Sequence, residues 1–402
     1  MKAIFINHCH PKINHVCGVR AGRFAEIMAV RGHKIMLLTQ TLADKNDSFP
    51  PPELERRLAA HDWQRPFQLS CLPSGDFDAI QARQGALPAG RQQLAVLWSF
   101  IKHGGMFPDW QTGVVPYISG LAKVFRPDVV WGTFGNTDTW RLCQQLAGQA
   151  NCPWIGDLKD NWQAFIPRGL QTLLAGRFKD TAGMTVFSSA HYDQADAVFP
   201  NIMKTVLYSG VDMETSATGP ADGFQLMLTG SIYDQEALVS LTRAVDEWSH
   251  ARPEKNVIFR YAGNDGEIFK ACAKGTSFSS RIEGFLGHAE LHHLQSAAAA
   301  NLYIYNPRCL LHYKALELIA QGRPVIAFPG ETPEVKSLAS NAGAVFFTCD
   351  GKEPVMQALD MIADTPTPPV RPDRLRDFTW ERRTKVLESV LEHAVSRARQ
   401  QS

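Results

Sequence analysis

Residues 302–327 read LYIYNPRCLLHYKALELIAQGRPVIA and contain a strand–helix–strand pattern. An apolar run ends at Tyr305, a polar loop follows, and a helix is predicted to begin near Tyr313. Gly322 then ends the helix, and the apolar run that starts at Pro324 predicts a second buried strand. This order of elements is typical of the parallel sheet of an α/β protein.

The same alternation of β-rich runs with Ala-rich or amphipathic stretches extends through all 402 residues. It predicts two sets of parallel strands with helices on both faces. Strands of the first set are expected at residues 3–6, 34–39, 128–132, 154–157, 185–188 and 205–209, and those of the second set at 225–229, 257–262, 282–285, 302–305, 324–327 and 344–347.

A polar stretch without apolar periodicity lies between the two sets, at residues 213–223, and is predicted to be a linker. We therefore expect an N-terminal Rossmann-like domain over residues 1–212 and a C-terminal domain over residues 224–375. Residues 376–402 carry apolar side chains at helical spacing and predict a terminal amphipathic helix.

The chain has 41 Lys and Arg residues against 40 Asp and Glu residues, so its formal net charge is +1. This balance argues against a dedicated nucleic-acid binder, whose affinity depends on clustered cations. A hydrophobic fraction of 45% excludes a disordered chain. The eight cysteines form no CxxC pair, which favours reduced thiols.

The amino-terminal sequence does not resemble a signal peptide, because only a short apolar run follows Met1 and Lys2. No segment approaches the roughly 18 apolar residues of a membrane span. We therefore expect a cytoplasmic protein, and peripheral contact with a membrane remains an alternative.

Residues 44–120 are the least regular part of the chain and are rich in Pro and Gly. Within them, the apolar run 94–101 is followed by Lys102 and His103. Two interpretations are open for this run: a helix packed on the core of its own domain, or an interfacial helix at a membrane. The first is favoured because apolar helices usually bury against their own domain.

The loop after the first strand is the first candidate site, and residues 8–20 read HCHPKINHVCGVR. A strand, a loop with glycine and a helix amino terminus place backbone N–H groups at the carboxyl edge of a parallel sheet, where ligands bind. Gly18 has no side chain and would let a ligand approach the backbone closely. Arg20 is expected to face the phosphate or sugar part of that ligand. No GxGxxG motif is present, which disfavours a nicotinamide dehydrogenase.

The same loop contains three histidines and two cysteines, so a zinc site is an alternative interpretation. Adjacent residues such as His8, Cys9 and His10 point in different directions from a strand end, and their spacing is not that of a structural zinc site. We therefore expect no metal site here.

The loop and helix of residues 306–317 form the second candidate site. Lys314 and Glu317 are three residues apart and share one face of the predicted helix, and Arg308 lies in the loop before it. A lysine and a carboxylate at a helix amino terminus suit a nucleotide diphosphate, because the ammonium meets phosphate and the carboxylate accepts bonds from ribose hydroxyls. From spacing alone, a surface ion pair is the default interpretation.

Residues 314–327, KALELIAQGRPVIA, resemble the donor motif of GT-B glycosyltransferases, particularly glycosyltransferase family 4. In that family, a glutamate before an Ala-x-Gly-x-Pro-Val-Ile stretch contacts the ribose of the nucleotide sugar, which implies this role for Glu317. Except for residues 44–120, the resemblance covers nearly the whole chain. The other similar segments are 1–39, 127–130, 209–212, 229–231, 261–263, 282–291 and 378–381.

The resemblance implies a GT-B architecture, in which two Rossmann-like parallel-sheet domains face a cleft and the C-terminal helix packs back toward the first domain. It implies that Lys314, with the loop at Gly230 and Ser231, holds the diphosphate. The chain departs from the family pattern at two places. Cys309 stands where many members carry a second glutamate, and residues 231–236 contain acids where an Arg and a Lys are common. Arg308, Lys314 and the amides near Gly230 and Gly18 are the available substitutes.

Asp160 is the candidate catalytic residue of the first domain, together with Lys314 in the second. Residues 157–162, DLKDNW, resemble an Asp-x-Arg-Asp-x-Trp sequence of bacterial glycosyltransferases that build lipid-linked or surface polysaccharide. Asp160 is expected to orient or deprotonate an acceptor hydroxyl. A carboxylate that satisfies backbone groups at the sheet edge is an equal alternative.

We therefore predict a glycosyltransferase that moves a sugar from a nucleotide-diphosphate sugar to an acceptor hydroxyl. The acceptor is expected to be a carbohydrate, lipid-linked or small molecule, in polysaccharide, glycolipid or glycoconjugate synthesis. The resemblance implies retention of anomeric configuration, with no cofactor or metal ion. Two alternatives remain: an inactive GT-B-like binding or partner subunit, and a sugar-nucleotide epimerase.

Overall fold

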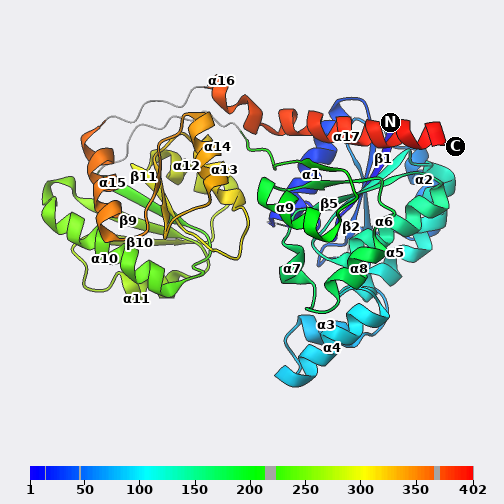
Figure 1. Cartoon of the computed structure of the whole chain (residues 1–402), viewed down its shortest axis with the longest axis horizontal. Helices are drawn as coiled ribbons and strands as arrows, with labels where there is room; N and C mark the ends of the chain where they lie inside the picture. Colours follow the sequence, from blue (N-terminus) through cyan, green and yellow to red (C-terminus); the bar gives the residue numbers. More distant parts are fainter. Residues whose placement is uncertain (14, 45–46, 213–222, 366–371, 402) are drawn as a thin grey trace. The chain divides into compact units, whose positions relative to one another are not determined.

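Buried apolar strands form a parallel sheet in each of two units (Figure 1). The computed structural model describes residues 1–13, 15–44, 47–212, 223–365 and 372–401. One unit comprises Met1–Gly210 and Trp380–Ser402, and the other comprises Val211–Thr379. Apart from Gly223, the predicted linker at residues 213–223 lies outside the described residues.

The first unit contains a seven-stranded sheet in the order β3-β2-β1-β4-β5-β6-β7, and every neighbouring pair is parallel. The chain runs outward from β1 to β3, returns beside β1 with β4 and runs outward to β7, so a topological switch point lies between β1 and β4. The strands are β1 (Lys2–Ile6), β2 (Lys34–Gln40), β3 (Phe67–Cys71), β4 (Val129–Thr133), β5 (Trp154–Leu158), β6 (Gly183–Val186) and β7 (Lys204–Val206).

The helices of the first unit connect these strands and cover the sheet (Figure 1). Right-handed crossovers on opposite sides of the switch point place the helix after β1 and the helix after β4 on opposite faces. The helices are α1 (Val16–Val30), α2 (Leu54–Ala59), α3 (Asp78–Arg83), α4 (Ala89–Lys102), α5 (Pro108–Gly120), α6 (Thr137–Ala150), α7 (Trp162–Phe165), α8 (Gln171–Arg177), α9 (Ser189–Val198) and α17 (Trp380–Gln401).

The second unit contains a six-stranded parallel sheet in the order β10-β9-β8-β11-β12-β13, whose switch point lies between β8 and β11. Its strands are β8 (Phe224–Thr229), β9 (Val257–Ala262), β10 (Ser279–Gly284), β11 (Ala300–Ile304), β12 (Val325–Phe328) and β13 (Phe346–Thr348). Its helices are α10 (Gln235–Ala251), α11 (Gly266–Cys272), α12 (His288–Ala297), α13 (Tyr313–Ala320), α14 (Pro333–Ala342), α15 (Lys352–Asp364) and α16 (Pro372–Leu375).

The predicted α/β class with two parallel sheets is confirmed, and each of the predicted strands is present. The C-terminal helix α17 belongs to the first unit and packs on α1, as predicted. The sequence prediction missed β3, which lies inside the irregular segment 44–120. Its sequence, FQLSC, contains two polar residues, so the strand lacks a continuous apolar run. The side-chain amide of Gln68 donates hydrogen bonds to the hydroxyls of Thr39 and Ser70.

The apolar run 94–101 forms most of α4, and only one face of the helix is buried. Phe100 and Ser99 lie in the interior, whereas Leu94 and Trp98 are exposed. The expectation of a helix packed on the core is therefore met by one face only. No helix among the described residues is long and apolar enough to cross a membrane.

A buried ion pair ties α1 to the first sheet. Arg20 and Asp157 are each fully buried, and the guanidinium donates two hydrogen bonds to the carboxylate, at 3.0 and 2.8 Å. Arg20 also donates to the Ser209 hydroxyl at 3.0 Å and to the Leu207 carbonyl at 2.9 Å. The pair therefore joins the first helix to β5 itself and to the segment that follows β7.

Substituting Arg20→Met should destabilise the first unit by about 3–5 kcal/mol, because it leaves the Asp157 carboxylate buried without a counter-charge. Thermal unfolding followed by tryptophan fluorescence measures the effect. The matched control is Arg56→Met, at an exposed arginine that pairs with Glu53, where a change within about 0.5 kcal/mol is expected. Equal effects of the two substitutions would contradict a structural role for the buried pair.

Candidate functional site

In the second unit, polar groups gather at the carboxyl edge of the sheet, beside the switch point between β8 and β11. β8 ends at Thr229 and β11 ends at Ile304, and the loop after β11 leads into α13. Ligands of open parallel sheets bind beyond such an edge, because the crossover loops diverge there and leave a crevice. The structure therefore places the sequence-predicted donor residues where this type of fold accommodates a ligand.

Lys314, in the first turn of α13, reaches back to the end of β8. Its ammonium donates a hydrogen bond of 2.7 Å to the carbonyl oxygen of Thr229 and lies against Gly230. Any side chain at Gly230 would collide with the Lys314 Nζ atom, and the positive φ of +87° at Gly230 also favours glycine. The structure thus brings Lys314 and Gly230 together, as the predicted diphosphate site requires.

The charges of Lys314 and Glu317 are only partly compensated. Burial lowers the pKa of Lys314 to about 8, against the opposing effect of the Glu317 carboxylate. Burial raises the pKa of Glu317 to about 7; the Lys314 ammonium opposes this shift and Asp212 adds to it. An ammonium has three N–H donors, and Thr229 uses one, so this group can bind a further anionic oxygen.

Two other predicted donor residues, Ser231 and Arg308, lie on exposed loops at the same edge of this sheet. The backbone N–H of Arg308 donates to the Asn306 side chain at 3.0 Å, which shapes the loop after β11. The amide of Gly230 donates to the Ala262 carbonyl at 2.9 Å, so Gly230 provides space rather than an N–H donor. The acidic run after Ser231 also has a local role, because Asp234 caps the amino terminus of α10.

His312 holds the loop between β11 and α13 in place. The Asn306 N–H donates to the His312 Nε2 atom at 3.0 Å, so this nitrogen acts as an acceptor. Burial, together with the Lys314 charge, lowers the pKa of His312 to about 4. His312 is therefore neutral near pH 7 and positions the loop that carries Arg308.

The sequence analysis missed Glu331, which follows β12 at the same edge. The hydroxyl of Tyr303 donates a hydrogen bond to the Glu331 carboxylate, and burial raises the pKa of Glu331. The ring of Tyr303 lies 5.9 Å from the Lys314 ammonium, so this tyrosine links Glu331 to the donor residues. An acid four residues after the predicted strand 324–327 was the available signal.

In the first unit, Asp160 lies just beyond the carboxyl end of β5, beside the amino terminus of α1. The Lys159 ammonium contacts its carboxylate at 2.8 Å, and the Cys17 thiol donates to the same carboxylate at 3.9 Å. Burial raises the pKa of Asp160, and the Lys159 charge opposes the shift. His15 caps α1 by accepting a bond from the Cys17 N–H at 3.2 Å.

Two buried polar atoms at the switch point of the first sheet have no hydrogen-bond partner among the described residues. They are Nε2 of His8, just after β1, and Oγ1 of Thr133, the last residue of β4. Burial and the Arg83 charge lower the pKa of His8 to about 4, so its ring is neutral. Thr133 was not singled out from the sequence, although a polar residue at the end of a buried strand is a recognisable signal.

The two remaining predicted residues, Gly18 and Arg20, have structural roles. A Cβ atom at Gly18 would lie 2.6 Å from the His10 carbonyl oxygen, so glycine allows α1 to pack against the loop after β1. Arg20 is fully buried and bound to Asp157, Ser209 and Leu207. The predicted contact of Arg20 with a phosphate or sugar does not fit this position.

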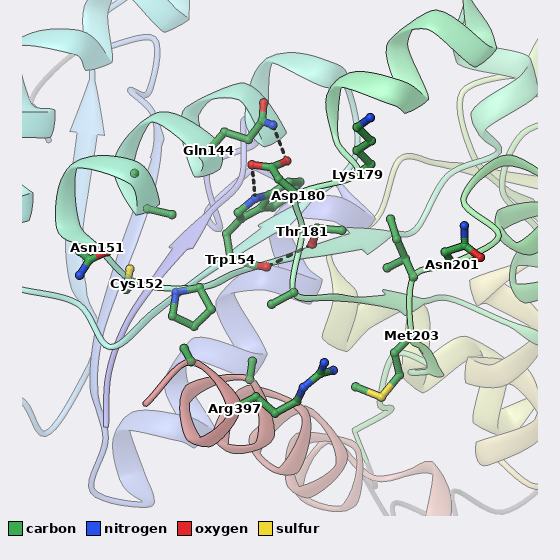
Figure 2. Close-up of a pocket in the computed structure, with 17 residues that line it drawn as sticks. Gln144, Asn151, Cys152, Trp154, Lys179, Asp180, Thr181, Asn201, Met203 and Arg397 are labelled. Carbon is green, nitrogen blue, oxygen red and sulfur yellow. Dashed lines mark hydrogen bonds between the residues drawn. The ribbon is translucent and has the colours of Figure 1, made fainter. Parts of the chain in front are cut away.

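A separate pocket lies at the opposite, amino edge of the first sheet (Figure 2). It is lined by α6, α17 and the turns before β5, β6 and β7. Figure 2 shows Asp180 between Gln144 and Trp154, which donate to its carboxylate at 2.6 and 3.4 Å. Asp180, the one acid among its lining residues, is already bound by Gln144 and Trp154, and ligands of parallel sheets bind at the carboxyl edge, so this pocket is not the candidate site.

One cluster has the geometry of a metal site among the described residues: His33, Glu388 and Glu392. Glu388 already pairs with Arg31 and with His33, and the amino-terminal nitrogen lies 3.1 Å from the His33 Nδ1 atom. With two cationic groups beside it, the cluster is an ion-pair network that holds α17 against the turn between α1 and β2.

No protein-family model and no curated protein matches the sequence. Solved structures do match. HepE of Anabaena, in complex with UDP and glucose, has a TM-score of 0.55 at 12% identity, over 100% of this chain and 99% of that chain. A glycosyltransferase of Rickettsia africae has a TM-score of 0.60 at 10% identity, over 98% of each chain.

The UDP-GlcNAc 2-epimerase of Methanocaldococcus jannaschii has a TM-score of 0.56 at 12% identity, over 98% of this chain and 100% of that chain. At such identities, the likeness establishes the fold alone. The chain therefore has the GT-B fold that the resemblance implied, with two Rossmann-like parallel-sheet domains. Membership of glycosyltransferase family 4 stays a prediction.

The raised pKa of Glu317 predicts a pH-dependent stability. Because its pKa rises from 4.5 to about 7 on folding, the folded state binds more protons in this window, and stability falls as the pH rises through it. The Glu317→Gln variant cannot titrate and should lack this loss. Thermal unfolding midpoints across the window test the difference; identical pH profiles for the two proteins would show that Glu317 is not the titrating group.

Proposed function

We propose that this protein is a glycosyltransferase that moves a sugar from a nucleotide-diphosphate sugar to an acceptor hydroxyl. The observation that carries the proposal is the Lys314 ammonium, held against Gly230 at the switch point of the second sheet, with Glu317 one turn later on α13. HepE, which has the same fold, was solved with UDP and glucose, which supports a nucleotide-sugar donor.

Lys314 and Glu317 suit the two ends of a nucleoside diphosphate. A phosphate oxygen would provide the charge that the partly compensated Lys314 ammonium lacks. Ribose hydroxyls would donate to the Glu317 carboxylate one turn further along the helix. Arg308 and Ser231, on the loops that flank α13 and β8, would complete the diphosphate contacts.

In the reaction, the acceptor oxygen forms a bond to the anomeric carbon on the same face from which the diphosphate leaves, as retention of configuration requires, while the bond from that carbon to the diphosphate breaks. The proton of the acceptor hydroxyl moves to the Asp160 carboxylate, whose raised pKa favours this transfer. Lys314 stabilises the charge that develops on the diphosphate, so no metal ion is required. Retention of configuration, an acceptor in polysaccharide, glycolipid or glycoconjugate synthesis, and a cytoplasmic location complete the proposal.

A sugar-nucleotide epimerase is the second candidate function, because the Methanocaldococcus jannaschii epimerase has the same fold. It would use the donor residues without an acceptor. Incubation with a panel of nucleotide sugars distinguishes the two: conversion of the donor sugar without any acceptor supports the epimerase, and transfer that requires an acceptor supports the transferase. If no nucleotide binds, the chain is an inactive partner subunit.

Substituting Lys314→Met should weaken binding of UDP by about 10- to 100-fold, because a charge-assisted hydrogen bond contributes roughly 1.5–3 kcal/mol. Calorimetric titration with UDP, ADP and GDP measures the loss for whichever nucleotide the wild type binds. In the wild type, affinity should also fall as the pH rises through about 8, where the ammonium loses its proton, while Lys314→Arg should remain charged.

The matched control for Lys314 is Lys270→Met, at an exposed lysine on α11 of the same unit. Its nucleotide affinity should equal that of the wild type. If both substitutions reduce affinity equally, the effect is one of general charge and the site assignment is wrong.

Substituting Asp160→Asn should lower the rate of transfer by about 100- to 10,000-fold, because the amide cannot accept the hydroxyl proton. Nucleotide affinity should not change, since Asp160 lies in the first unit. Steady-state kinetics with saturating donor tests this, with Asp193→Asn on the exposed side of α9 as the control. A rate equal to that of the wild type would leave Asp160 a structural carboxylate.

A further inference from the structure

α4 exposes an apolar stripe that the fold of the first unit does not use. Leu94, Leu97, Trp98 and Ile101 are all exposed, with 67% of Leu94 and 55% of Trp98 accessible. Their spacing of three, four and seven residues places them on one face of the helix. The opposite face packs into the core through Phe100, so the helix is anchored while its apolar stripe remains outside.

The stripe continues onto the neighbouring helices of the same unit. A hollow lined by Gln92, Gln93, Val96, Leu97 and Pro167 joins α4 to the turn between α7 and α8. Phe165 on α7 and Leu173 on α8 are also more than half exposed. In Figure 1, α3 and α4 lie at one end of this unit, beside α7 and α8. We call α4 and residues 161–179 together the basic-apolar face.

The charges of the basic-apolar face are all of one sign. Neither α4 nor residues 161–179 contain an Asp or Glu. Asp76 and Asp78, outside the face, line a second hollow together with Trp98 and Lys102 of α4. Four cations of the face are exposed and form no ion pair within the described part of the chain: Arg91, Lys102, Arg168 and Arg177. Lys179 lines the pocket at the amino edge of the sheet and is not counted with them.

This combination fits an anionic lipid surface better than another protein or a nucleic acid. A second copy of this chain would bring these four cations against the same four, which repels. A nucleic acid would leave Leu94 and Ile101 without apolar contacts, since aromatic rings rather than aliphatic side chains stack on bases. Anionic headgroups pair with the cations while Leu, Ile and Phe enter the acyl boundary, and Trp98 prefers the interface between them.

We propose that the basic-apolar face docks the first unit onto a membrane that contains anionic lipid. This deepens the proposed function, on which it rests for its purpose: an enzyme at the membrane surface meets acceptors that are lipids or lipid-linked sugars. The contact is peripheral, with α4 lying in the interface. Because the stripe is already exposed in the folded unit, docking requires no unfolding of the helix.

Co-sedimentation of the full chain with vesicles tests the proposal. We expect binding to vesicles of equal parts phosphatidylcholine and phosphatidylglycerol, and little binding to phosphatidylcholine alone. Raising the salt concentration should weaken the binding, because it screens exposed charges. Absence of binding to the anionic vesicles at low salt overturns the proposal.

The double variant Leu94→Ser/Trp98→Ser should lower vesicle affinity by roughly tenfold or more, because it removes two large apolar groups from the contact. Arg168→Gln/Arg177→Gln should lower affinity and also reduce the salt dependence. The matched control is Phe285→Ser, at a residue of the second unit that is 65% exposed, and its binding should equal that of the wild type. Equal losses in the control and in the α4 variant overturn the assignment.

Two further measurements separate the remaining explanations. Circular dichroism and nucleotide titration of the α4 variant should match the wild type, so a loss of vesicle binding is not a loss of fold. Sedimentation equilibrium without vesicles should show the same mass for both proteins; a wild-type dimer that the α4 variant abolishes would mean that a second copy covers the face. Failure of nucleotide binding with intact vesicle binding would contradict the proposed function and leave the docking surface standing.

Discussion

The parallel sheet, buried on both faces, is the constraint on which the rest of this structure depends. The central strands of each sheet carry polar side chains mainly near their ends, because the interior leaves no water to solvate them. Each crossover connection enters a strand at its amino end. The loops that leave the carboxyl ends run in opposite directions at the switch point and so diverge there. The candidate groups of both units accordingly lie at the carboxyl edge: Thr133 and Asp160 in the first, Lys314 and Glu331 in the second.

Two cations near the amino ends of helices show how the surroundings separate a structural from a functional charge. Arg20 of α1 is fully buried and makes four hydrogen bonds, two of them to a carboxylate, so nothing remains for a ligand. Lys314 of α13 donates one hydrogen bond to a neutral carbonyl, and burial lowers its pKa to about 8. The first cation stabilises the fold, and the second has capacity to bind an anion.

Sequence patterns sufficed for the fold because continuous apolar runs mark strands that are buried on both faces. They failed at β3, where Gln68 and Ser70 bond to one another and interrupt the run. For the site, spacing could place Lys314 and Glu317 on one helix face and Gly230 at a strand end. It could not reveal that Arg20 faces Asp157, because that contact joins residues 137 positions apart in sequence.

The same limit applies to exposure. From the sequence, the apolar run of α4 predicts a helix packed on the core. Hydrophobicity alone does not show which face of a helix packs against the rest of the protein. Only the packed structure shows that Phe100 is buried while Leu94 and Trp98 are outside. Likewise, Glu331 and Tyr303 form a pair because β11 and β12 are adjacent strands, a relation that no local pattern encodes.

The net charge of the whole chain is near zero, but the local charge at the predicted donor residues depends on pH. With pKa values of about 8 and 7, Lys314 and Glu317 both titrate close to neutral pH, so the pair can change its net charge without leaving the folded state. A bound anion stabilises the protonated form of each group, which raises both pKa values. If the proposed diphosphate binds at this pair, its binding near pH 7.5 would therefore be coupled to proton uptake. A single lysine beside a neutralisable glutamate thus provides more positive charge to a ligand than the sequence count of fixed cations suggests.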